Sequence, residues 1–273
     1  MDEKQQKLLE HEKQQRAQKR KYLMISVVSV CVFFFVWELI TGILHILPDY
    51  TMPSPVKVLD SFIKKFYTKT PDGEILPVHI ITSLKVSLFG FFLGSVTGVP
   101  IGIMMAWHPR FEKFFRPLFD LIRPVPTVAW IPIMILWFGI GLGAKAAVIF
   151  VSAFIPCVVN SFAGIKQTSQ VHLWVAQTFG ASRREMLFRI AIPTALPSIF
   201  TGLRLSLGSS WMALVAAEML AANKGLGYMI YTSRSLGRAD LIIVGMLTIG
   251  AIGAILSYVL GIAEKRIVKG VSR

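Results

Sequence analysis

The sequence is poor in charged residues and has almost no cysteine. Charged side chains make up only 16% of the 273 residues, whereas 54% are hydrophobic. Because soluble domains carry about 25% charged residues, this composition excludes a soluble globular protein. Both cysteines, Cys31 and Cys157, lie inside apolar runs. A disulfide framework is therefore excluded, and we interpret the two thiols as small apolar packing groups.

Catalytic and metal-binding motifs are also missing. The sequence has no Walker phosphate loop, no H-E-x-x-H motif and no Cys/His cluster with metal-site spacing. The histidines are scattered over the predicted tail and loops, at His11, His45, His79, His108 and His172. The sequence therefore predicts no catalytic residue and no metal site.

Long apolar runs are what the chain does contain. A helix crosses a bilayer with about 20 apolar residues, and six runs are long enough: Tyr22–Leu47, His79–Trp107, Arg116–Phe138, Ala144–Lys166, Thr194–Ala222 and Asp240–Ala263. The predicted fold class is all-α integral membrane, with about six transmembrane helices. We expect a basic tail at 1–21, a first transmembrane helix at 22–47, an external linker at 48–78, a five-helix core at 79–266 and a tail at 267–273.

The formal charge of +14 is distributed in a way that indicates orientation, not nucleic acid binding. Basic clusters occur at four places: before the first span, between the second and third, after the fourth, and at the C-terminus. With six spans, all four clusters fall on the same side of the membrane. The positive-inside rule makes that side cytoplasmic, which predicts a multi-pass protein with both termini inside.

Two patterns predict how individual helices pack. In the external linker, Ser54 and Pro55 are typical of a helix start. Apolar residues then line one face (Val56, Leu59, Ile63 and Phe66) and charged residues the opposite one (Lys57, Asp60, Lys64 and Lys65). We predict an interfacial helix there. In the second span, Gly90, Gly94, Gly98 and Gly102 recur every four residues, which favours close packing against another helix of the same chain.

Three ionisable residues lie well inside apolar spans: Glu38, Arg204 and Glu218. A charge at the bilayer centre costs on the order of 3 kcal/mol, so such residues usually face protein or a wet cavity. Arg204 could hold an oxyanion through two parallel hydrogen bonds. The alternative is a structural ion pair with Glu218 or Glu38. Further candidates for a transport path are Trp37, Pro132, Asn160 and Trp211, with packing, interface or interhelical hydrogen-bonding roles as their alternatives.

A basic, helix-patterned segment, Ala176–Pro197, separates two of the apolar spans. An apolar face leads into it, at Val171, Trp174, Val175, Thr178 and Phe179. Gly180 then offers a left-handed helix stop, and Ser182 with Glu185 forms a capping box that starts a second helix. Pro193 ends that helix or begins the next span. This pattern predicts a helix–Gly–helix elbow outside the bilayer, at about 171–193, that serves as a docking surface.

The elbow resembles the EAA loop in permease subunits of bacterial ATP-binding-cassette (ABC) importers. In that motif a glycine is separated by nine residues from I-x-L-P, and here nine residues separate Gly180 from Ile190-Ala191-Ile192-Pro193. Ala176 also matches, whereas Trp174 replaces the acidic residue of the family. Other segments look like the nitrate/sulfonate/bicarbonate/taurine branch: Met52–Pro55, Arg123–Gly141, Gly202–Met219 and Lys224–Ile230.

The resemblance implies a type I importer permease in the bacterial plasma membrane, working as a homodimer with two cytoplasmic ATPase subunits and an extracytoplasmic substrate-binding protein. ATP and Mg²⁺ would bind to the ATPase, so this chain would be no enzyme and hold no cofactor. The implied cargo is a small organic or inorganic oxyanion. The implied ATPase-coupling residues are Trp174, Ala176, Phe179, Gly180, Ser182, Arg183, Arg184, Glu185, Ile190 and Pro193.

From the residues alone, two other classes stay open. One is a membrane scaffold whose elbow docks a cytosolic protein without transport. The other is an integral membrane enzyme, which needs a polar catalytic cluster that the sequence does not display. Related permeases also serve vitamin precursors and aromatic acids, so the sequence does not identify the cargo.

Overall fold

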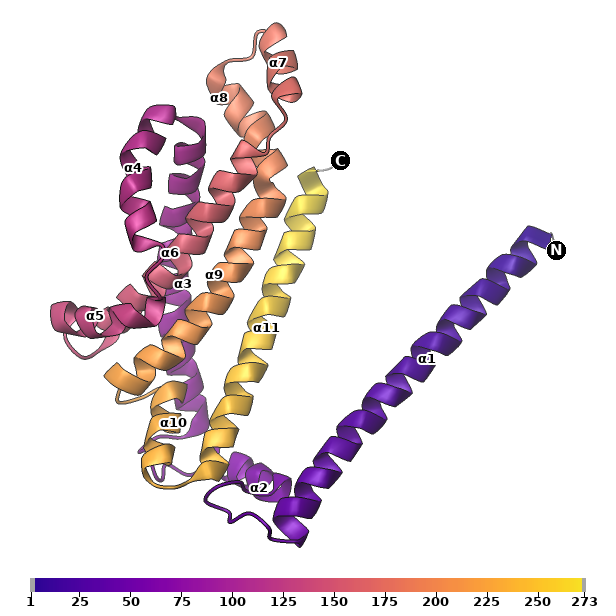
Figure 1. The fold of residues 1–273 in the computed structure, drawn as a ribbon, viewed down its shortest axis with the longest axis vertical. Coiled ribbons are helices and arrows are strands. Elements are labelled where there is room, and N and C mark those ends of the chain that lie inside the picture. The colour runs from indigo at the N-terminus through magenta and orange to yellow at the C-terminus, as the bar shows by residue number, and fades with distance from the viewer. Residues whose placement is uncertain (1–2, 272–273) are drawn as a thin grey trace.

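The computed structural model describes the backbone of residues 3–271 and the side chains of 15, 18 and 20–268, and each regular element in it is helical (Figure 1). The helices are α1 (Glu3–Glu38), α2 (Pro55–Lys65), α3 (Leu76–Trp107), α4 (Pro109–Ile122), α5 (Ile131–Phe138), α6 (Leu142–Lys166), α7 (Gln170–Thr178), α8 (Arg183–Met186), α9 (Ile192–Ala221), α10 (Leu226–Ser235) and α11 (Ala239–Val271). Two π-helical segments, Leu39–Ile43 and Leu187–Ala191, and a 3-10 turn, Thr127–Trp130, complete the list. The predicted all-α class is confirmed.

Five helices in the described range are long and apolar enough to cross a membrane: Arg20–Ile43, Leu76–Trp107, Leu142–Lys166, Arg183–Ala221 and Ala239–Val268. The predicted span Arg116–Phe138 is not one continuous helix, although counting it as one bent span gives the predicted six. It is a pair, Pro109–Ile122 and Thr127–Phe138, bent by 87° at the break. Pro124 and Pro126 cause the break, because proline lacks a backbone donor and disfavours helix at the preceding residue.

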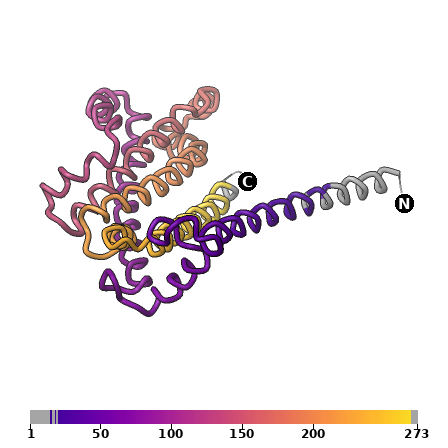
Figure 2. The backbone as a smooth tube through the Cα atoms, turned by 60° about the horizontal axis from the view of Figure 1, so that its bottom comes forward, coloured from indigo at the N-terminus to yellow at the C-terminus, as the bar shows by residue number. Residues whose placement is uncertain are grey.

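The centre of the molecule is a layer in which α6 packs between α3 and α9, with α11 beside α9 (Figures 1 and 2). The buried cores lie along these contacts. In contrast, α1 leaves the bundle at an angle and touches it only near its C-terminal end (Figure 1). The most apolar stretch of the α1 span is not buried at all by the rest of the chain.

The glycine column of α3 packs against α6, as predicted. A Cβ at Gly90 would lie 2.6 Å from the Ile149 side chain, and one at Gly94 would lie 2.6 Å from the Ala153 Cβ. Further along, a Cβ at Gly102 would lie 2.5 Å from the Val158 carbonyl oxygen. Real side chains do not approach so closely, so the column is what lets the two backbones meet.

We expect Gly102→Ala to destabilise the protein by about 1 to 3 kcal/mol, since the new methyl group meets rigid backbone. The matched control is Gly250→Ala on α11, where a Cβ would meet nothing within 4 Å. That change should be neutral or stabilising by up to about 1 kcal/mol, because alanine favours helix. Thermal unfolding of both variants in detergent measures the difference, and equal shifts would contradict this account.

The helix predicted in the external linker forms, but a different face packs. The Ser54 hydroxyl caps α2 by accepting the Lys57 backbone N–H. The predicted apolar face points away from the bundle, and Val56 is 65% exposed. Lys65, predicted on the charged outer face, is 1% exposed. The exposed apolar face is consistent with an interfacial helix, whereas Lys65 departs from the predicted pattern because it has buried polar partners on a loop that periodicity does not place.

Candidate functional site: the elbow and a buried polar chain

The elbow has the predicted construction. Helix α7 ends at Thr178, and Gly180 follows with φ +77°, the left-handed conformation that glycine accepts without strain. Both hydrogen bonds of the capping box between Ser182 and Glu185 are present. The Ser182 hydroxyl accepts the Glu185 backbone N–H at 3.3 Å, and the Glu185 carboxylate accepts the Ser182 N–H at 2.9 Å. The restart of the second helix is therefore fixed at Ser182.

The second helix of the elbow does not stop at Pro193. It continues through the π-helical segment Leu187–Ala191 into α9, so that Arg183–Ala221 forms one span of 39 residues. Of the two predicted alternatives, the structure has Pro193 in the first turn of α9, where its missing N–H is tolerated. The second helix of the elbow is therefore continuous with a bundle helix.

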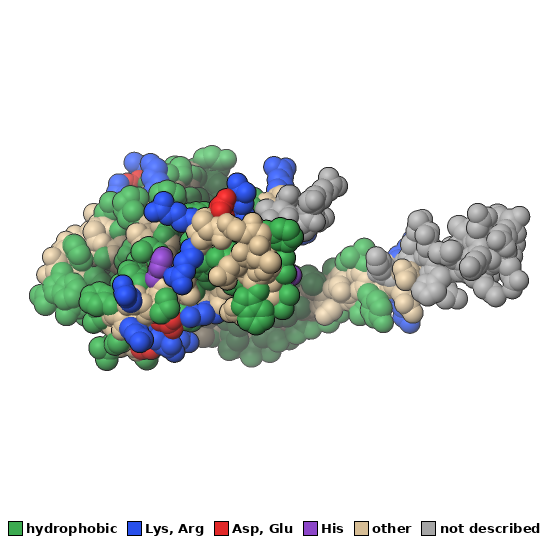
Figure 3. Space-filling view, turned by 90° about the horizontal axis from the view of Figure 1, so that it is seen from above, with side chains coloured by type: hydrophobic (Ala, Val, Ile, Leu, Met, Phe, Trp, Pro, Cys, Tyr) green, Lys and Arg blue, Asp and Glu red, His purple; other side chains and the backbone are tan. Residues whose placement is uncertain are grey.

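The elbow projects from one end of the bundle and exposes apolar side chains there (Figure 1). Trp174 is 63% exposed and Phe179 is 87% exposed. A hollow of about 260 Å³ lies between the two helices, lined by Phe179, Gly180, Ala181, Glu185, Arg189 and Ile190. Lys and Arg side chains surround this end of the molecule (Figure 3). Exposed aromatic groups beside a polar hollow are typical of a protein docking surface.

Arg204 forms an ion pair, but with neither predicted partner. Its guanidinium contacts the carboxylate of Glu264 on α11. Glu218 cannot be reached, because at 1.5 Å per residue it lies about 21 Å further along the same helix. Glu38 is elsewhere, and accepts the backbone N–H of Val56 at 3.4 Å. Glu264 was not predicted as a partner because it lies just past the predicted end of the last span, Ala263.

Glu218 is fully buried at the opposite end of the bundle from the elbow. The Ser83 hydroxyl of α3 lies 2.8 and 2.9 Å from its two carboxylate oxygens. The backbone N–H of Gly227 donates to Glu218 at 2.9 Å, and that of Leu226 donates to the Ser83 oxygen at 2.9 Å. These bonds hold α9 to α3 and to the start of α10.

Beside this group, His79 connects to the loop that precedes α3. Its Nδ1 accepts the Gly225 backbone N–H at 3.0 Å, so Nε2 carries the ring proton. Nε2 lies 3.3 Å from an oxygen of Asp72, close but without the alignment of a full hydrogen bond. Asp72 also forms an ion pair with Lys65 of α2, whose ammonium donates to the carbonyls of Thr70 and Glu74.

We call Lys65, Asp72, His79, Ser83 and Glu218 the buried polar chain. Each of the five is at most 7% exposed. The prediction that His79 is one of several scattered loop histidines is wrong, because His79 is buried in α3. No role was predicted for Asp72 or Ser83. The sequence feature that could have indicated the buried polar chain is the glycine-rich segment Lys224–Gly227. A Cβ at Gly225 would lie 2.3 Å from the Glu218 carboxyl group. Glycine is required there because a carboxylate occupies the space of a side chain.

Acid should weaken this arrangement. Burial by itself raises the pKa of Asp72, but the contacts with His79 and Lys65 outweigh burial and lower that pKa below its ordinary value. Such a carboxyl stabilises the fold above its unfolded pKa, about 3.9, and the contribution is lost as pH falls through the folded pKa. We expect unfolding temperatures measured below about pH 4 to fall more steeply for the unchanged protein than for Asp72→Asn. Parallel curves would contradict the assignment.

The remaining predicted path residues are dispersed. Trp37 donates to the Pro53 carbonyl oxygen at 3.1 Å, and the buried Trp211 donates to that of Ile249 at 3.0 Å. The predicted interhelical hydrogen bond of Asn160 is wrong, since its amide donates to Pro156 of its own helix. Pro132 lies in the first turn of α5. The structure does not bring these residues together into one site.

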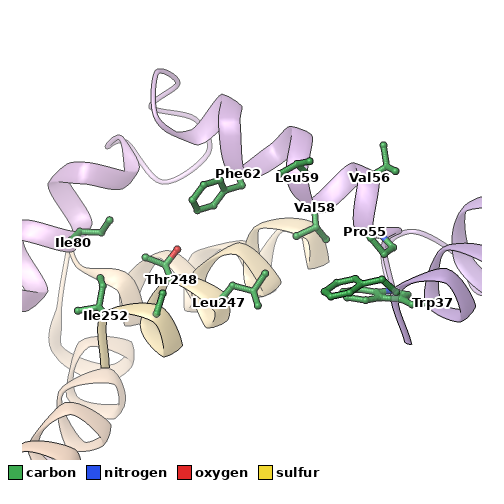
Figure 4. A pocket seen from close by; sticks show the side chains of 12 residues that line it. Trp37, Pro55, Val56, Val58, Leu59, Phe62, Ile80, Leu247, Thr248 and Ile252 are labelled. Atoms are coloured by element: carbon green, nitrogen blue, oxygen red, sulfur yellow. The ribbon is translucent and has the colours of Figure 1, made fainter. Parts of the chain in front are cut away.

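An apolar groove of about 670 Å³ lies between α1, α2 and α11 (Figure 4). Its wall includes Trp37, Val58, Phe62 and Ile252, and its Thr248 hydroxyl is bonded to the Val244 carbonyl. Among the described residues, none that lines the groove is charged. A groove of this kind offers nothing to hold an anion, because a desolvated anion needs hydrogen-bond donors.

Comparison with known proteins decides the family. A family model described as the binding-protein-dependent transport system inner membrane component matches residues 98–273. The chain belongs to this family of ABC transporter permeases. A putative ABC transporter permease of Methanocaldococcus jannaschii is 36% identical over 86% of this chain and 88% of its own length. The taurine transport permease of Escherichia coli is 33% identical over 90% of each chain.

Further matches agree with this. A putative aliphatic sulfonates transport permease of Bacillus subtilis is 30% identical over 92% of this chain and 89% of its own length. Among solved structures, an inward-facing methionine ABC transporter is 21% identical and matches with a TM-score of 0.59, over 71% of this chain and 95% of that one. At that identity the match shows that the permease has the same fold.

Membership in this family shows which subunit of the transporter hydrolyses ATP. The permease is the membrane component of an importer, and ATP hydrolysis belongs to a separate ATPase subunit. The family description, a binding-protein-dependent transport system, also implies a substrate-binding protein as a partner. The scaffold and enzyme alternatives are not favoured, and the permease is a multi-pass membrane protein.

Proposed function

We propose that this permease pairs with a second copy of itself to form the translocation path for a small oxyanion, of the taurine, sulfonate or nitrate class. The relatives named above transport taurine and aliphatic sulfonates, and a further one, a nitrate import permease from Synechocystis, is 29% identical over 88% of this chain. All of these cargoes carry negatively charged oxygens. The permease holds no cofactor of its own, and ATP and Mg²⁺ bind to the partner ATPase.

The main observation that supports this proposal is the elbow. Its two helices meet at Gly180 and expose Trp174 and Phe179, and the second of them continues without a break into α9. An ATPase that grips the elbow therefore moves a bundle helix when it closes. The coupling residues are the ten predicted in the elbow, with Arg183 and Arg184 exposed for an acidic groove on the partner. Where the EAA loop of the family has an acidic residue, this permease has the exposed side chain of Trp174.

The orientation follows from the charges around the elbow. Lys and Arg side chains gather at this end (Figure 3), and the basic residues Arg110, Lys113, Arg183 and Arg184 of α4 and α8 are exposed. By the positive-inside rule this end is cytoplasmic. Both termini then lie in the cytoplasm, and α2, the 66–75 loop and α10 lie on the extracytoplasmic side.

The test of the proposed function is reconstitution of the permease with its ATPase and binding protein in lipid vesicles. ATP-dependent uptake of labelled taurine, alkanesulfonate or nitrate is the expected result. Uptake of a neutral vitamin precursor or an aromatic acid, with no oxyanion transported, would contradict the cargo class. Co-purification of the permease without any ATPase would contradict the importer assignment.

Arg204 is the residue we expect to meet the oxyanion. Its side chain is 53% exposed although it lies within a span, and Glu264 holds only one edge of the guanidinium. We expect Arg204→Gln to raise the KM for uptake about tenfold, equivalent to about 1.4 kcal/mol. The matched variant is Glu264→Gln, which removes the partner but leaves the cation. If the pair is purely structural, both variants lower stability alike and neither changes KM selectively.

A further inference from the structure

We infer that the buried polar chain transmits docking of the substrate-binding protein to α9, and so to the ATPase. This inference rests on the proposed orientation, in which the end that carries Lys65 and Asp72 is extracytoplasmic. The five residues are positioning residues: none needs to touch the cargo or ATP. Their role is to fix the outer loop and the outer end of α9 as one body.

The first step is the attachment of the outer surface to the chain. Helix α2 and the 66–75 loop form the surface next to the bundle on that side, and Lys65 joins them. Its ammonium is buried and contacts Asp72 together with the carbonyl oxygens of Thr70 and Glu74, at 3.1 and 2.8 Å. A partner that presses on α2 or the loop therefore moves Asp72 with it.

The second step crosses to the corner between α9 and α10. His79 lies between Asp72 and the backbone N–H of Gly225, at 3.3 and 3.0 Å. An exposed ion pair between Glu74 and Lys224 joins the same loop to the same corner a second time. The backbone of the corner packs closely on α9, since a Cβ at Gly227 would lie only 2.4 Å from the Val215 carbonyl oxygen.

The third step is the attachment to α9. Glu218 receives the Gly227 N–H and the Ser83 hydroxyl, and lies one turn before the end of α9 at Ala221. The other end of the same 39-residue span begins at Arg183 in the elbow. At 1.5 Å per residue, the span is about 58 Å long. One helix thus has its outer end fixed in the buried polar chain and its inner end in the coupling elbow.

A chain of contacts alone does not establish coupling, so the test measures coupling directly. The unchanged transporter and two variants are reconstituted with ATPase, and ATP hydrolysis is measured with and without the loaded binding protein. His79→Asn keeps an acceptor near the Nδ1 position for Gly225 but loses the contact with Asp72. His79→Gln does the reverse. Asp49→Asn, on an exposed ion pair of the same side, is the control.

Both His79 variants should lower the ratio of stimulated to basal hydrolysis by about three- to tenfold, the size of coupling effects in proteins. Basal hydrolysis and the Kd for the binding protein should change little, and Asp49→Asn should keep the full ratio. Ser83→Ala combined with either variant should lower the ratio by less than the product of the single effects. A double variant with less than the multiplied effect would indicate that His79 and Ser83 act in the same pathway.

Two results would overturn the inference. One is an unchanged ratio in both His79 variants. The other is an equal fall of basal and stimulated hydrolysis, which indicates a purely structural role. If the binding protein fails to stimulate even the unchanged transporter, the proposed function itself is contradicted, and the two failures are thereby distinguished.

Discussion

Replacing Gly180 with leucine should lower ATP-driven uptake by at least about tenfold while the permease still inserts into the membrane. Gly180 has φ +77°, a conformation that costs a residue with a side chain about 1 to 2 kcal/mol. No atom lies within 4 Å of the position of its Cβ, so the chain itself leaves room for a side chain. The damage therefore comes from strain at the bend and from a bulky group in the hollow beside Phe179.

The control for this prediction is Gly180→Asn, because asparagine tolerates the left-handed conformation. We expect the asparagine variant to retain most uptake and the leucine variant to lose at least about tenfold, equivalent to about 1.4 kcal/mol of coupling. Uptake in vesicles, ATP hydrolysis and the amount of inserted permease are measured together. Normal substrate-stimulated uptake in Gly180→Leu, or equal losses in both variants, would refute the assigned role.

The largest loss of stability should follow from Asp72→Ala. The change leaves the Lys65 ammonium, 1% exposed, without its carboxylate, and only backbone carbonyls remain to solvate it. Breaking a buried pair in this way costs about 3 to 5 kcal/mol. Replacing both residues, as Lys65→Met with Asp72→Leu, should recover much of the loss because no uncompensated charge is left.

The matched control is the exposed pair between Lys64 and Asp60 on the same helix, with side chains 70% and 53% exposed. Asp60→Ala should change the free energy of unfolding by at most about 1 kcal/mol. Denaturant or thermal unfolding of the purified permease gives all three values. Similar losses for Asp60→Ala and Asp72→Ala would show that burial of the Lys65 pair is not what makes it strong.

Local patterns in the sequence were enough to predict the elbow. The left-handed stop at Gly180 and the capping box of Ser182 with Glu185 depend on residues within a few positions of one another, and the structure has both. The packing of the glycine column also follows from spacing alone, since a smooth ridge on α3 requires a close neighbour.

What the sequence could not predict depends on which distant segments meet. Arg204 pairs with Glu264, sixty positions away, and the pairing follows from the relative heights of α9 and α11. His79 looked like a loop residue because its partners, Asp72 and Gly225, come from two separate turns. Periodicity predicts which face of a helix is apolar, but at Lys65 a buried carboxylate overrode it.

The 87° bend between α4 and α5 has a consequence for how the protein is made. Phe119, before the bend, packs on Phe154 of α6, and Ile131, after it, packs beside Val148. The bend therefore lies about halfway along α6, and Arg123 to Pro126 are all exposed in the single chain.

Hydrocarbon cannot satisfy irregular backbone at that depth; only protein or water can. If the bend lies within the membrane, a single chain leaves this backbone without such cover. We therefore expect assembly with further subunits to supply the protein surface that covers Arg123 to Pro126.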